Sequence, residues 1–404
     1  MKAAPLAALL LAAAGAVAVA AGATAPVELR GLAVLPADTF AGGPPSGASD
    51  DPGARAPAPR FAAQPVQGVS SIQPGPRAGT WWALSDNGYA LRWNSYDYRL
   101  ALYLFALLPR TRADDPRAAD AAGRVRLLRR IALRDPRRVF PWRLTEESLR
   151  DRPLTGADAD PESLVAMPDG TFWIGDEVGP WLLHVSARGE LLEPPVELEV
   201  ALDGGERQAI RSAVHPLVLA GKARAQLRNS KGFEGLALGP TPGTLLAMLE
   251  GPLPGDPPDV VRVLEFDLAR RAWTGRSWRY RLDDPRQMIS ELVPAGGGAY
   301  LVIERDDTQG EAARFKRIFR IDLAAADDAG VLRKTLLVDL LDLADPLHLG
   351  GTSGHFRYPY WCTEAAWLLA PHELLVVDDN NFPATGGRSA TLRDPTEWIW
   401  LRLP

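Results

Sequence analysis

Short runs of apolar and β-branched residues, separated by turn residues, recur along most of the chain. Each run is short and bounded by turn signals, which is typical of β-strands. Helical periodicity is weak, and its best stretch, Gln208–Lys222, is interrupted by Pro216. We therefore expect an all-β chain with strands that include Val27–Leu35, Trp81–Leu84, Phe172–Ile174, Leu245–Met248, Tyr300–Ile303 and Leu374–Val377.

Five of these runs belong to an internal repeat with an acidic residue at each end. From the turn residue to the closing acid the step is seven residues at Gly79–Asp86, Gly170–Glu177 and Gly243–Glu250, six at Gly298–Glu304, and seven at His372–Asp379. Seven to nine residues before the turn lies an opening acid in four copies, and the first copy has Ser70 or Ser71 in its place. The opening residues of the other copies are Glu162, Glu234, Glu291 and Glu364.

The spacing predicts a strand, a tight turn and a second strand in each copy. The open ends of an antiparallel hairpin lie side by side, so the opening and closing acids meet there. Arranged radially as the blades of a β-propeller, the hairpins place these ends around one mouth of a central channel. Further strands fit between the copies at Leu182–Ser186, Val261–Asp267 and Arg317–Leu323. With one blade undetected, we expect six blades.

Gathered carboxylates repel one another, so such a ring predicts bound cations. Ca²⁺ takes six to eight oxygen ligands from carboxylates, amides and water, and no His pair or Cys cluster competes for a softer metal. For any single acid, a solvated turn residue is the alternative. The expected metal ligands are Asp86, Asn87, Glu162, Asp176, Glu177, Glu234, Glu250, Glu291, Glu304, Glu364, Asp378, Asp379 and Asn380.

Basic residues lie among these acids. Lys231 precedes Glu234, Arg305 follows Glu304, and Lys316 lies on the next expected strand. A metal together with Lys or Arg is the usual clamp for a phosphoryl group. The motifs of serine hydrolases, zinc proteases and Walker loops are absent from the sequence.

The N-terminus predicts export to a periplasm or the cell exterior. Lys2 is followed by an apolar or small stretch from Ala3 to Ala23 and a small-x-small cleavage site, as in a secretory signal peptide over 1–25. An uncleaved membrane anchor is the alternative. We expect one domain over 26–404, with an irregular Pro/Gly-rich loop at 36–65 and no membrane attachment after cleavage.

The composition limits the classes of ligand that the protein is expected to bind. A net charge of −5 gives no support for nucleic-acid binding. The single cysteine, Cys362, excludes an intramolecular disulfide and a multi-cysteine zinc site. We expect a monomer that binds a small, phosphorylated molecule.

As a set, the motifs resemble the phytase-like family, described as "esterase-like activity of phytase", from about residue 60 to 400. They are SDNG (85–88), DADPESL (158–164), DGTFWIGDEVGPWL (169–182), NSKGFEGLAL (229–238), EGPL (250–253), ISEL (289–292), VIERD (302–306), FKRIFRIDL (315–323), TEAAWLL (363–369) and VVDDNNF (376–382).

The resemblance implies a β-propeller related to calcium-dependent alkaline phytases, in which calcium at the channel mouth binds phosphate and activates water. Carried over to this chain, it implies phosphate binding by Lys231, Arg305 and Lys316. Our leading hypothesis is a Ca²⁺-dependent phosphoesterase. A metal-dependent lactonase or other esterase, and a non-catalytic binding propeller, are the alternatives. The expected catalytic residues are Asp86, Glu177, Glu250, Glu304 and Asp379.

Overall fold

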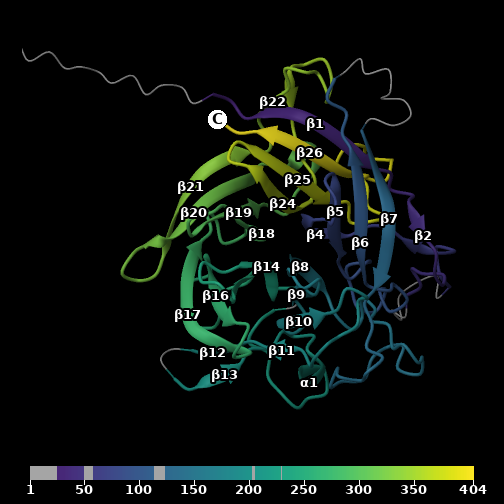
Figure 1. Ribbon diagram of the computed structural model, residues 1–404, viewed down its shortest axis with the longest axis vertical. Coiled ribbons are helices and arrows are strands. Elements are labelled where there is room, and N and C mark those ends of the chain that lie inside the picture. Colours follow the sequence, from purple (N-terminus) through teal and green to yellow (C-terminus); the bar gives the residue numbers. More distant parts are fainter. Residues whose placement is uncertain (1–24, 50–57, 113–122, 203–204, 229) are drawn as a thin grey trace, which may run out of the picture.

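The chain folds into a β-propeller whose blades surround a central channel (Figure 1). The computed structural model describes residues 25–49, 58–112, 123–202, 205–228 and 230–404. The innermost strands β4, β8, β14, β18 and β24 contact one another in that order, and β24 returns to β4. The ring of innermost strands is therefore closed.

Each blade is a four-stranded antiparallel sheet that runs outward from the channel. The first has β4 (Val69–Pro74), β5 (Thr80–Ser85), β6 (Ala101–Leu108) and β7 (Arg124–Ala132), and the second has β8 (Pro161–Ala166), β9 (Phe172–Asp176), β10 (Trp181–Val185) and β11 (Val196–Glu197). The third has β14 (Phe233–Leu238), β15 (Thr244–Leu249), β16 (Val260–Asp267) and β17 (Ala272–Arg281), and the fourth has β18 (Met288–Pro294), β19 (Ala299–Arg305), β20 (Lys316–Ala326) and β21 (Leu332–Asp339). The fifth has β24 (Cys362–Ala370), β25 (Glu373–Asp379), β26 (Thr396–Arg402) and β1 (Glu28–Leu35).

The blade count differs from our expectation of six. The described strands account for five blades, one for each hairpin repeat, and the closed contacts of the innermost strands leave no place for another. The segments between the hairpin repeats instead contribute the outer strands of these five blades.

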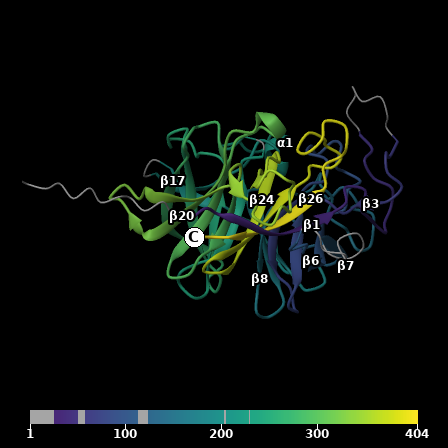
Figure 2. The same ribbon diagram turned by 90° about the horizontal axis from the view of Figure 1, so that it is seen from above.

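The two ends of the chain close the ring. β1 pairs antiparallel with β26, so the N-terminal strand completes the blade that the C-terminal strands begin (Figure 2). A single parallel pairing between Val34 and Arg124 joins β1 to β7 of the first blade. The expected strand at Val27–Leu35 thus forms, and it holds the last blade to the first.

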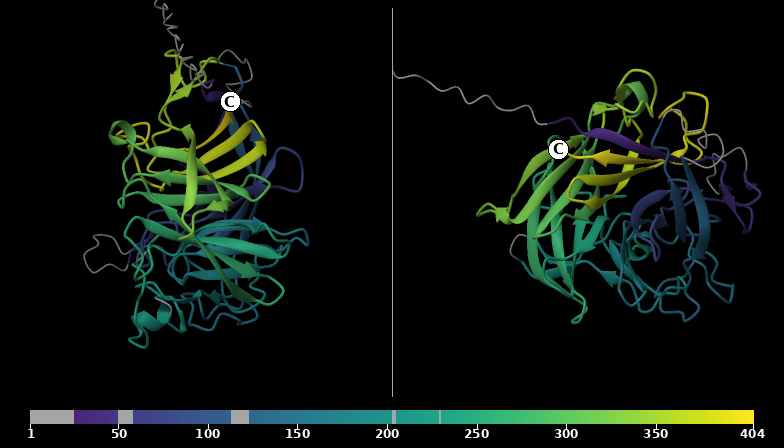
Figure 3. Two further views of the ribbon diagram at one scale, coloured as in Figure 1. Left: turned by 90° about the vertical axis from the view of Figure 1, so that its left-hand side faces the viewer. Right: turned by 45° about the horizontal axis from the view of Figure 1, so that its top comes forward.

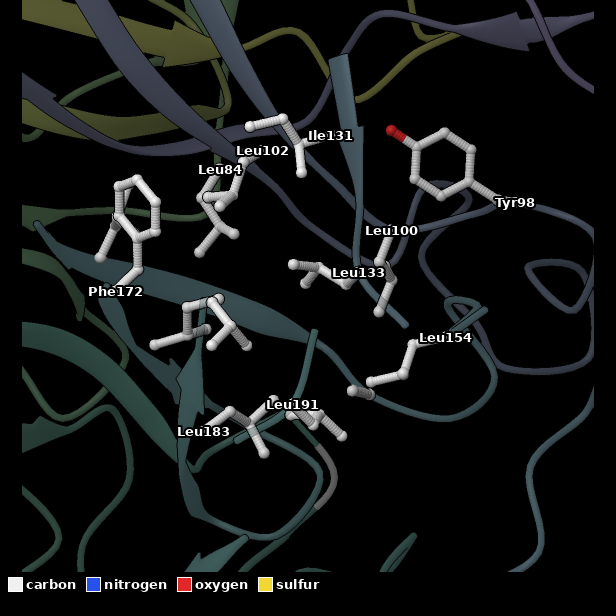
Figure 4. Close-up of a cluster of buried hydrophobic side chains, with 14 of the residues drawn as sticks. Leu84, Tyr98, Leu100, Leu102, Ile131, Leu133, Leu154, Phe172, Leu183 and Leu191 are labelled. Atoms are coloured by element: carbon white, nitrogen blue, oxygen red, sulfur yellow. The ribbon is translucent and has the colours of Figure 1, made fainter. Parts of the chain in front are cut away.

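Apolar side chains fill the spaces between neighbouring blades. Between the first and second blades, Leu84 and Leu102 face Phe172 and Leu183, and all four are at most 3% exposed (Figure 4). Comparable clusters occupy the other junctions. Because each blade buries both faces, the strand positions directed between blades require large apolar residues.

The loop at 36–65 is folded against the first blade. It contains β2 (Phe40–Ala41) and β3 (Gln64–Pro65), which pair with each other, and a bridge joins Ser46 to Phe61. The backbone N–H groups of Gly47 and Ala48 donate to Asp97 at 2.8 and 2.9 Å. The loop is therefore irregular, as expected, but tied down within its described part.

Helix is scarce among the described residues (Figure 3). Most of Gln208–Lys222, the best candidate for helical periodicity in the sequence, is not helical, and its start lies in β13 (Arg207–Ala209), which pairs with β12 (Glu199–Ala201). Only α1 (Pro216–Leu219) is helical there, and it begins at the proline, where the missing N–H costs nothing. The remaining elements are the 3₁₀ turn η1 (Gly310–Ala312) and the short strands β22 (Leu343–Ala344) and β23 (His355–Phe356).

Within the described part of the chain, no helix has the length and apolar character needed to span a membrane. The expected signal peptide falls on residues 1–24 and the cleavage site beside them, so it lies outside the described residues apart from Ala25.

Candidate functional site

Every innermost strand has a β-bulge at the same position, close to one mouth of the channel. The ladder between the first two strands skips one residue in each blade. Bulges often re-aim a side chain beside a functional site. The skipped residues are Ser70, Glu162, Glu234, Ser290 and Glu364.

The second strand of each blade contributes one more side chain at this mouth. In the ladders, the residues opposite the position before the bulge are Ser85, Asp176, Leu249, Glu304 and Asp378. The next residue along the chain is Asp86, Glu177, Glu250, Arg305 or Asp379. Four blades thus present a carboxylate at this position, and the fourth blade presents Arg305 together with Ser290.

Eight of these ten side chains, all except Ser70 and Ser290, line one pocket of about 230 Å³. Nine of its lining residues are Asp or Glu, whereas two, Lys231 and Arg305, are basic. The acids are Asp86, Asp160, Glu162, Glu177, Glu234, Glu250, Asp307, Glu364 and Asp379. Most are buried, while Asp86 and Glu162 are partly exposed and Asp307 lies exposed on the rim.

Two groups of three acids are close enough to share a cation. Asp160, Glu162 and Glu177 form one, and Glu177, Glu234 and Glu250 form the other, with ligand oxygens within 4.8 Å of one another in each. Glu177 belongs to both. Its Oε1 atom, Asn87 Oδ1 and Glu364 Oε2 are buried without a hydrogen-bond partner. Such a set of oxygen donors fits a hard divalent cation.

The two basic residues are each held by a carboxylate. Lys231 Nζ donates to Glu250 Oε2. Arg305 donates through Nη2 to Glu364 Oε1 and through Nε to Ser290 Oγ, both at 2.8 Å. They therefore offset part of the negative charge and stand on the pocket wall with donors to spare.

Burial dominates the electrostatics of the pocket. It raises the pKa of Glu162, Glu177 and Glu234 well above the usual value, and neighbouring carboxylates raise it further. The pKa of Asp379 is raised to about 7, first by burial and then by Glu364. For Lys231, burial lowers the pKa, but Glu250 and Glu177 raise it above its usual value overall. Without a cation, this pocket would hold protons at neutral pH.

Three expected ligands lie on the opposite side of their strands. Successive side chains in a strand alternate in direction, so Asp176, Glu304 and Asp378 point between blades and do not line the pocket. Asp176 accepts from the N–H groups of Asp160 and Gly179 at 2.7 and 2.8 Å. Asp378 accepts from the Tyr358 hydroxyl and the Glu397 N–H at 2.8 and 2.6 Å.

Glu304 is the expected catalytic residue that the structure places farthest from that role. Its carboxylate accepts from the Tyr280 hydroxyl at 2.6 Å, the Asp283 N–H at 2.7 Å and Lys334 Nζ at 2.6 Å. It is fully buried and not among the pocket residues. The shorter step from Gly298 to Glu304, six rather than seven, reflects this difference, because the seventh residue is Arg305.

Glu291 is one residue out of phase with the other opening acids. The bulge of its strand falls on Ser290, so Glu291 corresponds to Gly235 of the third blade. Glu291 instead accepts from Ser71 Oγ at 2.8 Å and from the Leu292 N–H at 2.9 Å. Because β18 and β4 are not neighbours in the ring, this hydrogen bond crosses the channel beneath the pocket.

Two further expected residues are engaged in structure. Lys316 is completely buried and donates to the carbonyl oxygens of Asp306 and Trp361 at 2.8 and 3.0 Å, so it is not available to phosphate. Asn380 donates to the Asp394 carbonyl at 3.0 Å and does not line the pocket. Expected residues that do line it are Asp86, Asn87, Glu162, Glu177, Lys231, Glu234, Glu250, Arg305, Glu364 and Asp379.

The expectation from sequence missed Asp160. Its carboxylate accepts from the Asn87 side-chain amide at 2.6 Å and from the Asn87 N–H at 3.1 Å, which joins the first blade to the second. The signal was its place two residues before Glu162 in the motif DADPESL. Trp361 and Cys362 also line the pocket and were not expected as site residues, and Asn381, which follows the expected ligand Asn380, lines it as well.

A family model described as "Phytase-like: Esterase-like activity of phytase" matches residues 64–382. An uncharacterized secreted protein from Arthroderma benhamiae is 23% identical over 188 residues, which are 39% of this chain and 36% of that protein. The chain therefore aligns with little more than a third of the length of that relative.

Among solved structures, an exo-β-1,3-galactanase from Phanerochaete chrysosporium has a TM-score of 0.39 and 9% identity, over 92% of this chain and 64% of its own. Regucalcin, a calcium-binding protein from Agrobacterium tumefaciens, has a TM-score of 0.34 and 11% identity, over 83% and 90%. The family match covers far more than half of the chain and includes the two inner strands of every blade, and on that ground the protein belongs to the phytase-like family.

Proposed function

We propose that the protein is an exported, metal-dependent hydrolase that cleaves phosphoesters, with Ca²⁺ as its metal. The observation that supports this most strongly is the composition of the pocket, where nine acids stand against two basic residues. A pocket with this charge repels a phosphate ester. It becomes a phosphate site only when cations fill it, so metal dependence and an anionic substrate belong to one proposal.

The acid groups that meet at Glu177 are the proposed metal ligands. Asp160 and Glu162 would complete one group, and Glu234 and Glu250 the other. A bound divalent cation supplies charge for the phosphoryl oxygens and lowers the pKa of a bound water. Asp176 would act indirectly, because its hydrogen bond to the Asp160 N–H fixes the backbone from which Asp160 extends.

Lys231 and Arg305 are the proposed phosphate-binding residues. Within the described residues, Arg305 uses two of its five N–H donors and Lys231 one of its three, so both retain donors for phosphate oxygens. Asp86 and Asp379, which line the pocket but belong to neither acid group, are the proposed acceptors of the proton that water releases on attack.

Export rests on the apolar stretch that follows Lys2 and on the relative that is named as a secreted protein. An extracellular or periplasmic setting agrees with Ca²⁺ as the metal, because low-affinity calcium sites occur in extracellular modules. Detection of the processed N-terminus by mass spectrometry of exported protein would test this part of the proposal.

The test of activity is phosphate release from phytate and from simple monoesters, with added Ca²⁺ and with a chelator. We expect release that requires Ca²⁺, together with bound metal in elemental analysis. Lactones and carboxylic esters are assayed in parallel, because hydrolysis of these alone would favour a lactonase or esterase. Protein that binds no metal and cleaves none of these substrates would contradict the proposal and favour a binding propeller.

A further inference from the structure

A second cavity opens beside the carboxylate pocket. It measures about 330 Å³, and it shares Asp86, Ala90, Trp361 and Asn381 with that pocket. A molecule held in the carboxylate pocket can therefore extend into this second cavity. We call it the annex, and its remaining lining residues are Arg60, Gly88, Tyr89, Asn94, Phe382, Pro383 and Ala384.

The chemistry of the annex differs from that of the carboxylate pocket. Its walls are aromatic, with Tyr89, Phe382 and Trp361, and the Trp361 side chain is 40% exposed. Its one basic lining residue is Arg60, set against the single carboxylate of Asp86 at the shared boundary. An aromatic wall with a cation favours a ring that carries a negative charge.

Arg60 is held in place by its surroundings and still has donors to offer. Its Nε donates to the Gly47 carbonyl at 2.9 Å, and its guanidinium lies 5.2 Å from the centre of the Tyr89 ring. Within the described residues Arg60 forms no ion pair, although it is exposed. A guanidinium fixed through Nε presents its two terminal nitrogens, which match a carboxylate.

The loop at 36–65 builds this arrangement. It contributes Arg60 and also Phe61, which packs 5.0 Å from Phe382 and 6.0 Å from Tyr89 between ring centres. Ser46 of the same loop hydrogen-bonds the Tyr89 hydroxyl at 2.8 Å. An insertion that the propeller does not need thus forms one wall of a cavity joined to the site.

We infer that the annex is the subsite for the alcohol part of the ester, and that Arg60 selects alcohols that carry a ring with a carboxylate. That the bound molecule is an ester rests on the proposed function, whereas binding of the alcohol in the annex does not depend on hydrolysis. Hydrolysis transfers the hydroxyl of water to phosphorus and its proton to the alcohol oxygen, so the group bound in the annex leaves as the free alcohol.

The test compares kcat/KM for 4-carboxyphenyl phosphate and phenyl phosphate in the presence of Ca²⁺. We expect the wild type to prefer the carboxylated ester by about tenfold, the effect of one charged hydrogen-bond pair. In Arg60→Ala this ratio falls to about one, and in Arg60→Lys it is intermediate because Lys keeps the charge without the fork. Arg77→Ala, an exposed arginine at the far turn of the first hairpin, keeps the wild-type ratio.

The ratio of kcat/KM values is taken within each variant. If a substitution in the loop lowers the fraction of folded protein, both values fall equally and the ratio is unchanged. Glucuronic acid 1-phosphate against glucose 1-phosphate forms a second pair, which separates a sugar acid from an aromatic acid as the preferred ring. A ratio near one for both pairs in the wild type, or an unchanged ratio in Arg60→Ala, would overturn the inference.

A binding measurement separates this inference from the proposed function. Calorimetric titration with 4-hydroxybenzoate and with phenol needs no hydrolysis. We expect 4-hydroxybenzoate to bind the wild type and Arg77→Ala alike, and to bind Arg60→Ala about tenfold more weakly. If no ester is cleaved but this difference is found, the phosphoesterase proposal fails and the subsite stands. If esters are cleaved but 4-hydroxybenzoate binds the wild type and Arg60→Ala equally well, the subsite inference is wrong and the phosphoesterase proposal is retained.

Discussion

Carboxylates near the ends of the second strands have opposite surroundings, depending on whether they face the channel or the space between blades. Glu177 faces the channel, with an oxygen that has no hydrogen-bond partner. Glu304 faces the space between blades, where a hydroxyl, a backbone N–H and a lysine satisfy it. Both are buried acids near the end of a second strand. Glu304 is therefore balanced by groups of the protein itself, while Glu177 keeps an oxygen free for a cation.

The largest effect should come from Glu177→Gln. This change keeps the shape but removes the carboxylate that both acid groups share, so we expect Ca²⁺-dependent hydrolysis to fall about a thousandfold. The metal-free variant should melt at a higher temperature than the wild type, because the repulsion with Glu250 is relieved. Calcium titration followed by thermal unfolding measures both, and a variant that still binds calcium like the wild type would contradict the two-face comparison.

Glu304→Gln should do the reverse. We expect metal binding to be retained and the free energy of unfolding to fall by about 3 kcal/mol, because Lys334 loses a buried partner. Chemical denaturation with the chelator present measures the loss. Replacing Lys334 with Met in the same chain should recover much of it, since the largely buried ammonium, whose remaining partner is the partly exposed Asp283 at 2.6 Å, is then removed. Loss of calcium binding in Glu304→Gln would place this residue back among the ligands.

Much of the fold could be predicted from sequence because its signals are local. The five hairpin repeats became five blades, and acids at the open ends of the hairpins do meet at one mouth. Ring closure by β1 and β26 was not predictable from the repeat, because it joins the two ends of the chain. The sixth blade was inferred from length, and length does not distinguish a further blade from outer strands.

The site was predicted less well because a shift of one residue along a strand reverses the direction in which a side chain points. In runs such as Asp176-Glu177, alternation sends one acid into the channel and its neighbour between blades, and the run does not reveal which. A bulge changes the direction of the side chains again. For this reason Glu291 was predicted at the opening position that Ser290 occupies. Lys316 was misjudged because its partners, the carbonyls of Asp306 and Trp361, come together only in the folded chain.

Calcium binding should weaken as the pH falls, by about tenfold between pH 8 and pH 6. Burial raises the pKa of Glu162, Glu177 and Glu234, and that of Asp379 to about 7, so protons compete with the metal across this range. Calorimetric calcium titrations at several pH values in two buffers would also count the released protons, and an affinity independent of pH would count against the channel acids as ligands.

The smallest effect concerns Glu291. It faces the channel, yet both of its carboxylate oxygens accept hydrogen bonds from the protein. Burial raises its pKa well above the usual value, so the folded chain keeps a proton that the unfolded chain releases at lower pH. Its contribution to stability is complete below the unfolded pKa and is lost as the pH rises through the folded one. Glu291→Gln removes this dependence, and we expect it to stabilise the metal-free protein at pH 8 by about 1 kcal/mol, the scale of one buried polar contact.

Near pH 3 the same variant should match the wild type, because this is below the unfolded pKa of about 4.3 and the wild-type carboxyl is then protonated in both states. Glu311→Gln, a change at an exposed acid, serves as the control and should leave stability unaltered at either pH. Denaturation curves at the two pH values give the comparison. If Glu291→Gln is destabilising at pH 8 and weakens calcium binding, the carboxylate beneath the pocket acts with the channel acids after all, and the boundary between the two kinds of site lies one residue deeper in the channel.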